Sequence, residues 1–249
     1  MDNQANELRF AVLIDADNVP YSNIKEMLEE VAKEGIPTIK RIYADWTKPT
    51  VSGWKDMLLE YAITPIQQYS YTTGKNSSDS ALIIDAMDIL YSNKVEGYCI
   101  VSSDSDFTRL ATRLREAGMK VIGMGEKKTP KSLITACDKF IYIENITPID
   151  QPDKKAEHKI VTHDTSGNKI DEKTKKLLID SVIDLADDTG WTFLGDLGNF
   201  VLKKKSDFDP RDYGFQKLFP LIKSLNAFEI EERETGRSNV KNIYVRVKQ

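Results

Sequence analysis

Two apolar runs in this chain lead directly into clusters of aspartates. The run FAVLI is followed by Asp15, and the run YCIV is followed by the segment 102–106, which contains Asp104 and Asp106. Neither run alternates with polar residues, which is typical of strands covered on both faces of a parallel sheet. In an open α/β sheet, ligands bind outside the carboxyl ends of the strands, near the point where the strand order reverses. The two clusters therefore predict a site at that edge of a sheet.

Strand-like and helix-like segments alternate through the first 145 residues. The expected strands are Arg9–Ile14, Thr38–Tyr43, Ile66–Tyr69, Gly97–Val101, Lys120–Met124 and Phe140–Ile143. The expected helices are Tyr21–Lys33, Ser52–Tyr61, Ser78–Ser92, Asp106–Ala117 and Pro130–Ala136. This alternation predicts an α/β fold class, with a mostly parallel sheet built from right-handed βαβ units and flanked by helices.

A second, smaller domain is expected after a linker. Residues 147–172 are polar with few apolar positions, so we interpret 1–146 as the first domain, 147–172 as the linker and 173–249 as the second domain. The second domain shows three helical segments followed by two strand-like runs. The segments are Leu177–Leu185, Leu194–Leu202 and Asp212–Leu225, and the runs are Phe228–Glu231 and Val240–Val247. Three helices and a β-ribbon predict a small winged-helix domain.

Charge is distributed unevenly along the chain, whose net charge is −4. Residues 1–172 carry 21 Lys and Arg against 27 Asp and Glu, whereas residues 173–249 carry 14 against 12. An acidic N-terminal part suits a cation-binding site, and no global basic field draws in nucleic acid.

The sequence gives no indication of export or membrane insertion. No apolar run reaches the ~18 residues that a membrane helix needs, and the polar start differs from a signal peptide. Cys99 and Cys137 form neither a metal-binding spacing nor a disulfide framework. We therefore expect a cytoplasmic protein with no membrane partner.

Four carboxylates are the candidate catalytic and metal-binding residues: Asp15, Asp79, Asp104 and Asp106. Asp79 opens the third expected helix, from which its side chain could reach the same edge of the sheet. A single acidic segment after a strand is often only turn and cap chemistry. Two such segments together with Asp79 favour a site, and cations would keep four neighbouring carboxylates ionised. Because the ligands are all oxygens, Mg²⁺ or Mn²⁺ is expected rather than zinc.

The first domain contains no histidine, since His158 and His163 both lie in the expected linker. This argues against a Ser-His-Asp triad and against histidine-ligated zinc. Hydrolysis at this site would take its nucleophile from a metal-activated water or from a carboxylate.

Six lysines are candidate RNA-binding residues: Lys75, Lys127, Lys128, Lys131, Lys203 and Lys204. Lys75 lies near Tyr69 and Tyr71, where rings and a cation would hold a single strand. The lysines at 127–131 follow the fifth expected strand, and those at 203–204 end a short helix; both groups would contact phosphates. A solvated basic loop and neutralisation of the helix C-terminus are the alternatives for these two groups.

At these residues the first domain resembles the NYN domain, a relative of the PIN-domain nucleases. The resemblance covers residues 9–145 and is carried by VLIDADN (12–18), by GKNSSD (74–79) with ALIIDAMD (81–88), and by SSDSDF (102–107). Residues 173–249 resemble an OST-HTH, or LOTUS, domain through WTFLGDLG (191–198) and FDPRDYGFQKL (208–218). The combination is similar to bacterial LabA-like proteins.

The resemblance implies a PIN-like fold and a ribonuclease that depends on a divalent metal. It places Asp15, Asp79, Asp104 and Asp106 at the acidic positions of the family, with Asn18 and Ser103 as supporting polar residues. It also implies that the second domain binds RNA or a protein partner. The sequence leaves open the RNA target, the number of metal ions and whether the chain forms a homo-oligomer.

Two other functions stay open at this point. The segment Asp15-Ala-Asp17 after a strand also resembles the nucleophile motif of haloacid-dehalogenase-like phosphatases, in which Asp15 would be phosphorylated and Asp17 would act as acid and base. A non-catalytic RNA-binding adaptor is the other alternative, since the second domain has the outline of a binding module.

Overall fold

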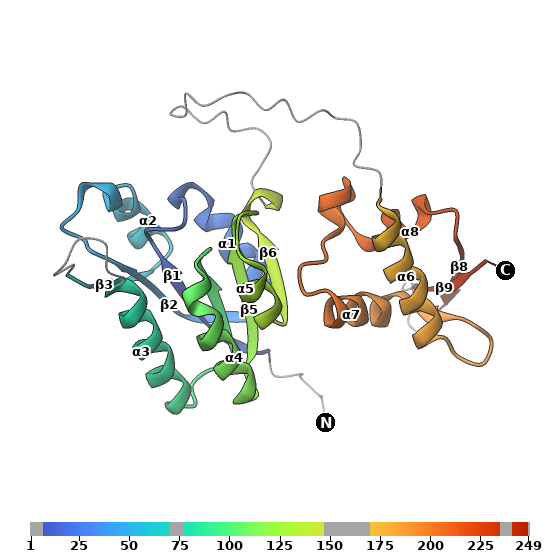
Figure 1. The fold of residues 1–249 in the computed structure, drawn as a ribbon, viewed down its shortest axis with the longest axis horizontal. Coiled ribbons are helices and arrows are strands. Elements are labelled where there is room, and N and C mark those ends of the chain that lie inside the picture. Colours follow the sequence, from blue (N-terminus) through green and yellow to red (C-terminus); the bar gives the residue numbers. More distant parts are fainter. Residues whose placement is uncertain (1–6, 70–76, 147–169, 235–240, 249) are drawn as a thin grey trace. The chain divides into compact units, whose positions relative to one another are not determined.

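The computed structural model describes residues 7–69, 77–146, 170–234 and 241–248. The chain divides into two compact units, Met1–Ile149 and Asp150–Gln249 (Figure 1). The N-terminal unit has a hydrophobic core on each face of its sheet, and the C-terminal unit has a core of its own. The expected linker falls almost entirely outside the described residues.

Six parallel strands form the sheet of the N-terminal unit, as the alternation of strand and helix signals predicts. They are β1 (Arg9–Asp15), β2 (Ile36–Ala44), β3 (Thr64–Gln67), β4 (Gly97–Val101), β5 (Lys120–Gly125) and β6 (Lys139–Tyr142). Their order is β3-β2-β1-β4-β5-β6, so the strand order reverses between β1 and β4. These two strands pair directly, with Ile14 opposite Val101, and their carboxyl ends therefore lie side by side.

Helices cover both faces of this sheet (Figure 1). They are α1 (Ile24–Ala32), α2 (Trp54–Glu60), α3 (Ser77–Tyr91), α4 (Thr108–Glu116) and α5 (Lys131–Ala136). Phe10, Val12 and Ile14 of β1 pack in one core with α1 and α2. Ala11 and Leu13 point to the other face and pack in a second core with α3, α4 and α5. Burial of both faces explains why the sequence of β1 is a continuous apolar run.

Two strands begin two residues earlier than predicted, and proline accounts for both differences, whereas the other four strands match the prediction to within one residue at each end. β2 begins at Ile36 rather than Thr38 and includes Pro37, and β3 spans 64–67 rather than 66–69 and includes Pro65. Proline lacks a backbone N–H and is tolerated in a sheet only where no neighbouring strand needs that donor. β3 is an edge strand, and β2 pairs with it only from Arg41 onward. A prediction that starts a strand after its proline therefore places the start too late, as it did for β2 and β3.

Three helices and a small antiparallel sheet make up the C-terminal unit, which agrees with the expected winged-helix outline. The helices are α6 (Glu172–Leu185), α7 (Leu194–Lys204) and α8 (Leu218–Ser224). The strands are β7 (Thr192–Phe193), β8 (Phe228–Glu234) and β9 (Lys241–Val247), in the order β7-β9-β8. No helix within the described ranges combines the length and the apolar character that a membrane crossing requires.

The expected helix Asp212–Leu225 was wrong in its first half. A 3-10 turn at Pro210–Tyr213 ends at Gly214, whose φ of 81° lies in the left-handed region that ends helices, and α8 begins only at Leu218. Asp209 caps this turn by accepting a hydrogen bond from the Arg211 backbone N–H at 2.9 Å. Strand β7 was missed because two residues are too few to show a periodic pattern.

Gly97, the first residue of β4, provides a test of the packing beneath β1. A Cβ at this position would collide with the ring of Phe10, which is fully buried. We expect Gly97→Ala to lower the free energy of unfolding by about 1–3 kcal/mol, the usual cost of overpacking a core. Urea denaturation followed by circular dichroism measures this loss.

The matched control is Gly198→Ala in α7, where the nearest side-chain atom would lie 3.5 Å from the new Cβ. Alanine favours a helix over glycine by about 1 kcal/mol, so this variant should be as stable as the wild type or more stable. Equal stability of Gly97→Ala and the wild type would contradict the packing described here.

Candidate functional site

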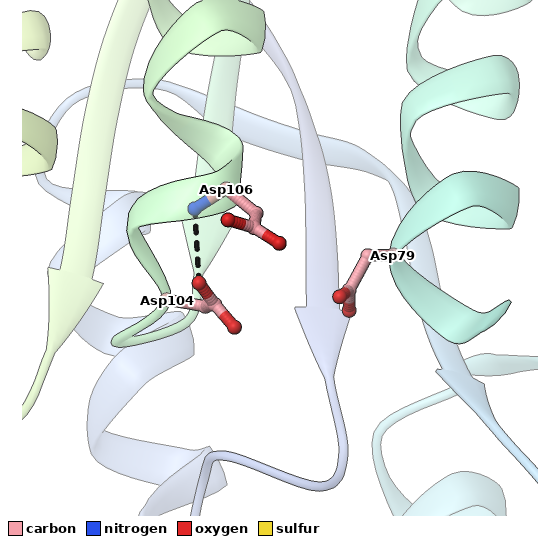
Figure 2. Close-up of side chains that lie close together, drawn as sticks. All are labelled: Asp79, Asp104 and Asp106. Atoms are coloured by element: carbon pink, nitrogen blue, oxygen red, sulfur yellow. Dashed lines mark hydrogen bonds between the residues drawn. The ribbon is translucent and has the colours of Figure 1, made fainter. Parts of the chain in front are cut away.

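Three of the four predicted aspartates meet at the carboxyl edge of the parallel sheet. Asp79, Asp104 and Asp106 each offer one carboxylate oxygen, and these oxygens lie within 4.8 Å of one another. Figure 2 shows that Asp79 approaches from the first turn of α3, while Asp104 and Asp106 approach from the segment that follows β4. We refer to these three residues as the acidic cluster.

A short 3-10 turn holds two members of the acidic cluster. The turn spans Ser105–Phe107, and Asp104 caps it by accepting a hydrogen bond from the Asp106 backbone N–H at 2.9 Å. The Asp104 backbone N–H in turn donates to Ser102 Oγ at 3.1 Å. Cap chemistry and the acidic cluster are therefore one feature here, because the turn that needs Asp104 also presents Asp106 beside it.

Asp79 is the member of the acidic cluster with the most perturbed carboxyl group. It is only 7% exposed and lies in the first turn of α3, where the helix dipole favours a negative charge. Burial nevertheless raises its pKa from 3.8 to about 6, and the charges of Asp15, Asp104 and Asp106 add to the rise. A cation bound here would offset the repulsion between these carboxylates and favour the ionised form of Asp79.

Asp15 lies outside the acidic cluster, although its charge acts on Asp79. It is the last residue of β1 and is 1% exposed. Its Oδ2 accepts hydrogen bonds from Asn18 Nδ2 at 2.6 Å and from Ser102 Oγ at 2.9 Å. Burial raises the pKa of Asp15, and these two bonds oppose the rise without cancelling it. The structure therefore holds Asp15 in a fixed, hydrogen-bonded position next to the cluster.

Ser102 contacts the candidate site and was missed by the sequence prediction. It follows β4 directly and lies one position beyond the pair Ile14–Val101, which places it beside Asp15. The sequence does contain a signal for this contact: if two apolar strands pair and end at the same level, the residues that follow them lie next to each other. The predicted Ser103 is buried and accepts a hydrogen bond from the Glu126 backbone N–H at 2.9 Å, so it links the ends of β4 and β5.

Asp85 anchors the helix that carries Asp79. Its carboxylate forms an ion pair with Arg41 and accepts a hydrogen bond from the hydroxyl of Tyr43, both residues of β2. Burial, together with the neighbouring Asp85 carboxylate, raises the pKa of the fully buried Tyr43 well above its ordinary value. These contacts give Asp85 a structural role and fix one side of α3 against β2.

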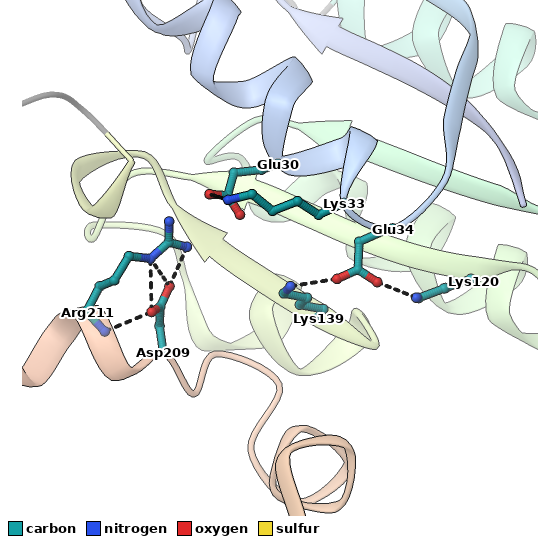
Figure 3. Close-up of polar contacts among 7 residues, drawn as sticks. All are labelled: Glu30, Lys33, Glu34, Lys120, Lys139, Asp209 and Arg211. Carbon is teal, nitrogen blue, oxygen red and sulfur yellow. Dashed lines mark hydrogen bonds and ion pairs between the residues drawn. The ribbon is translucent and has the colours of Figure 1, made fainter. Parts of the chain in front are cut away.

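Charged side chains at the opposite edge of the sheet are paired with one another (Figure 3). Glu34, just after α1, accepts hydrogen bonds from Lys120 Nζ at 2.5 Å and Lys139 Nζ at 2.7 Å. Burial alone would raise the pKa of Glu34, but the two lysines outweigh burial and lower it. Lys120 is the first residue of β5 and Lys139 is the first residue of β6. Their ion pairs with Glu34 therefore hold the amino ends of these strands together, at the edge of the sheet opposite the acidic cluster.

The predicted RNA-binding lysines that the structure describes lie after β5, at the start of α5 and at the end of α7. Lys75 lies outside the described residues. Lys128 forms an ion pair with Glu126, the Lys127 backbone N–H donates to Glu144 Oε1 at 2.8 Å, and Lys131 is exposed at the start of α5. In α7, Lys203 is exposed, whereas Lys204 pairs with Asp184 at 2.7 Å and lies over the ring of Phe200. Their RNA-binding role stays a prediction.

The order of the sheet and the acidic cluster at its reversal point define the N-terminal unit as a PIN-like α/β domain. The sequence matches the NYN domain over residues 9–144, and the chain belongs to this family. Residues 167–240 match the OST-HTH/LOTUS domain, so the family assignment made from the sequence motifs is confirmed for both units.

The chain is also similar to solved structures. A protein of unknown function from Vibrio parahaemolyticus is 21% identical, with a TM-score of 0.48, and the match covers 57% of this chain and 96% of that protein. An uncharacterized protein from Nitrosomonas europaea is 31% identical, with a TM-score of 0.30, and the match covers 41% of this chain and 90% of that protein. No curated protein matches the sequence.

The raised pKa of Asp79 predicts how metal-free protein responds to pH. Between 3.8 and about 6 the folded state binds more protons at Asp79 than the unfolded state does. The contribution of Asp79 to the free energy of unfolding therefore falls as the pH rises through this window and stays low at neutral pH. Asp79→Asn should abolish this fall and raise the stability at neutral pH by on the order of 1–2 kcal/mol after allowance for screening.

Urea denaturation in the presence of a chelator, repeated across this pH window, measures the effect. Asp88→Asn is the matched control, because Asp88 is an exposed aspartate on the same helix. If the free energies of unfolding of the wild type and of Asp79→Asn changed with pH in parallel, the pKa of Asp79 would not be raised in the folded state.

Proposed function

We propose that this chain is a ribonuclease that depends on a divalent metal, with RNA bound in part by its C-terminal unit. The observation that carries the proposal is the convergence of Asp79, Asp104 and Asp106 at the reversal point of an NYN-family sheet. An NYN domain followed by an OST-HTH/LOTUS domain supports a ribonuclease joined to an RNA-binding module.

The donor set of the acidic cluster suits a hard divalent cation. All of its donors are carboxylate oxygens, which favour Mg²⁺ or Mn²⁺ over softer metals. Burial is the main cause of the raised pKa of Asp79, and the neighbouring carboxylates add to it; a bound cation offsets both of these costs of the charged form. When bound, a divalent ion lowers the pKa of water and stabilises the negative charge of a phosphodiester transition state.

Asp15 is the proposed fourth acidic residue of the site. A carboxylate offers about four acceptor positions, and the bonds from Asn18, Ser102 and the Asp17 backbone N–H occupy three of them. The remaining position stays available to the site. Asn18 and Ser102 fix the orientation of Asp15, and Ser103 fixes the backbone from which Asp104 projects.

The environment of Asp15 disfavours the phosphatase alternative. A nucleophilic aspartate has to reach the phosphorus of its substrate, yet Asp15 is 1% exposed and its Oδ2 already accepts two hydrogen bonds. The match of this domain to the NYN family supports the same preference. The adaptor alternative differs from a nuclease only in catalysis, so an activity measurement distinguishes the two.

Metal binding to the acidic cluster should stabilise the fold. At about one hundred times its dissociation constant, an ion that binds only the folded state adds about 2.7 kcal/mol to the free energy of unfolding. We therefore expect Mn²⁺ to raise the thermal midpoint of the wild type in a saturable manner. Asp104→Asn should bind Mn²⁺ more weakly, which a thermal-shift titration detects as a higher half-saturation concentration. If the thermal midpoint of both proteins rose with Mn²⁺ without saturating, a specific site would be contradicted.

Cleavage of RNA by the wild type should require the acidic cluster. We expect Asp104→Asn to slow cleavage of a labelled RNA in Mn²⁺ or Mg²⁺ by at least on the order of a hundredfold, the scale on which loss of one electrostatic group slows an enzyme. RNA affinity in the presence of a chelator should change little, because fold and binding surface are retained. Gel electrophoresis of time courses measures the rates.

Asp56→Asn is the control for this experiment, since Asp56 is an exposed aspartate of α2 on the other face of the sheet. It should cleave at the wild-type rate. A wild type that binds RNA but leaves it intact with either metal would favour the adaptor.

A further inference from the structure

Two rows of side chains begin at the acidic cluster and run away from it along neighbouring helices. On α4, Arg109 follows Asp106 by three positions and Arg113 follows Arg109 by four. On α3, residues at four-residue spacing continue from Asp79 through Ile83 and Met87 to Tyr91. Residues three and four positions apart are neighbours on a helix surface, so each row lies on one side of its helix. We call these the arginine row and the apolar row.

The two rows face each other across the surface between α3 and α4. Asp85 contacts β2, and Met87 lies two residues further, about 200° around the helix, on the side directed away from β2. Arg115 pairs with Asp138 and donates to the Ala136 carbonyl of α5, so Arg113, two residues earlier, lies on the side directed away from α5. Figures 1 and 2 both show α3 and α4 next to each other on one face of the sheet.

The guanidinium groups of the arginine row have no acidic partner within the parts of the chain that the structure describes. Arg109 is exposed and Arg113 is half-buried. The exposed Glu116 near the end of α4 forms an ion pair with neither. Arginine presents a planar fork of donors that matches phosphate oxygens. Two unpaired guanidinium groups close to a site for phosphodiester chemistry are therefore placed for an external anion.

The apolar row becomes more exposed with distance from the acidic cluster. Asp79 is 7% exposed, Ile83 and Met87 are half-buried, and Tyr91 is 70% exposed. Ile84, beside this row, is 63% exposed. Large apolar and aromatic side chains left exposed in a row are typical of a binding surface, and flat bases stack on such side chains without regard to sequence.

We propose that the surface between the two rows holds a single-stranded nucleic acid that leads away from the acidic cluster. Arg109 and Arg113 bind its phosphates, and the apolar row, ending at Tyr91, lies beneath its bases. This inference rests on the proposed function of the acidic cluster and adds the path and the strandedness of the substrate. Charge complementarity favours this occupant, since its phosphates pair with both guanidinium groups.

The test is binding of a short fluorescent single-stranded RNA to the full chain in the presence of a chelator, which prevents cleavage. The variant Arg109→Gln/Arg113→Gln should bind at least about tenfold more weakly and lose about 1.4 from the slope of log affinity against log salt, since each phosphate contact on a single strand contributes about 0.7. Arg109→Lys/Arg113→Lys keeps both charges and should retain most of the affinity. Arg115→Gln, which removes one positive charge on the α5 side of α4, is the control and should bind like the wild type apart from its general loss of charge.

The outcomes separate this inference from the proposed function. The Gln variant should keep the Mn²⁺-dependent stabilisation of the wild type, which shows that its fold and its acidic cluster are intact. If the wild type cleaves RNA and the Gln and Arg115→Gln variants bind and cleave alike, the strand path is wrong and the ribonuclease stands. If the wild type never cleaves but the Gln variant alone loses binding, the strand path stands and the ribonuclease fails. A dimer that Ile84→Glu dissociates, with binding insensitive to both arginines, would assign the surface to a second copy and overturn the proposal.

Discussion

The direct parallel pairing of β1 with β4 is the constraint on which the whole site depends. It brings the ends of two apolar strands together, and with them Asp15 and Ser102. A buried carboxylate is costly unless hydrogen bonds compensate for its lost hydration, and Ser102 and Asn18 supply those bonds. The pKa of Asp15 is still raised, so the compensation is incomplete. The sheet therefore builds an electrostatically unfavourable edge, and burial of apolar side chains on both of its faces opposes that cost.

The second constraint is the placement of α3, which delivers Asp79 from a distant part of the chain. Helix α3 is held on one side by the contacts of Asp85 with Arg41 and Tyr43 of β2. With that side fixed, its first turn reaches the acidic cluster and its opposite side faces α4. Helix α3 thus has one side held against β2 and, about half a turn away, the side that carries the apolar row. The contacts of Asp85 fix the rotation of the helix and therefore the direction in which the apolar row faces.

Much of this arrangement follows from the sequence because the strongest signals are local. Continuous apolar runs located the buried strands, and the aspartates that follow them located the edge where the acidic cluster lies. The sequence could not show that Asp15 is held by Ser102 while Asp104 joins Asp79, because both contacts depend on strand register and on the packing of α3. Arg109 and Arg113 were missed for a related reason, because in the sequence they look like ordinary surface residues. Only the structure shows that no acid in its described part pairs with them. In the C-terminal unit, Gly214 broke a helix that periodicity alone had extended.

The distribution of charge explains why the proposed substrate path would depend on the arginine row. Residues 1–149 carry 21 acidic against 17 basic side chains, so long-range electrostatics repel a polyanion from the N-terminal unit. Attraction has to come from short-range contacts: a cation at the acidic cluster and unpaired guanidinium groups beside it. Each is worth little alone in physiological salt, because exposed charges are screened within about 8 Å. A second module on the same chain raises the effective concentration of RNA at the site, which gives the weakly attracting N-terminal unit a physical reason to be joined to an OST-HTH/LOTUS domain.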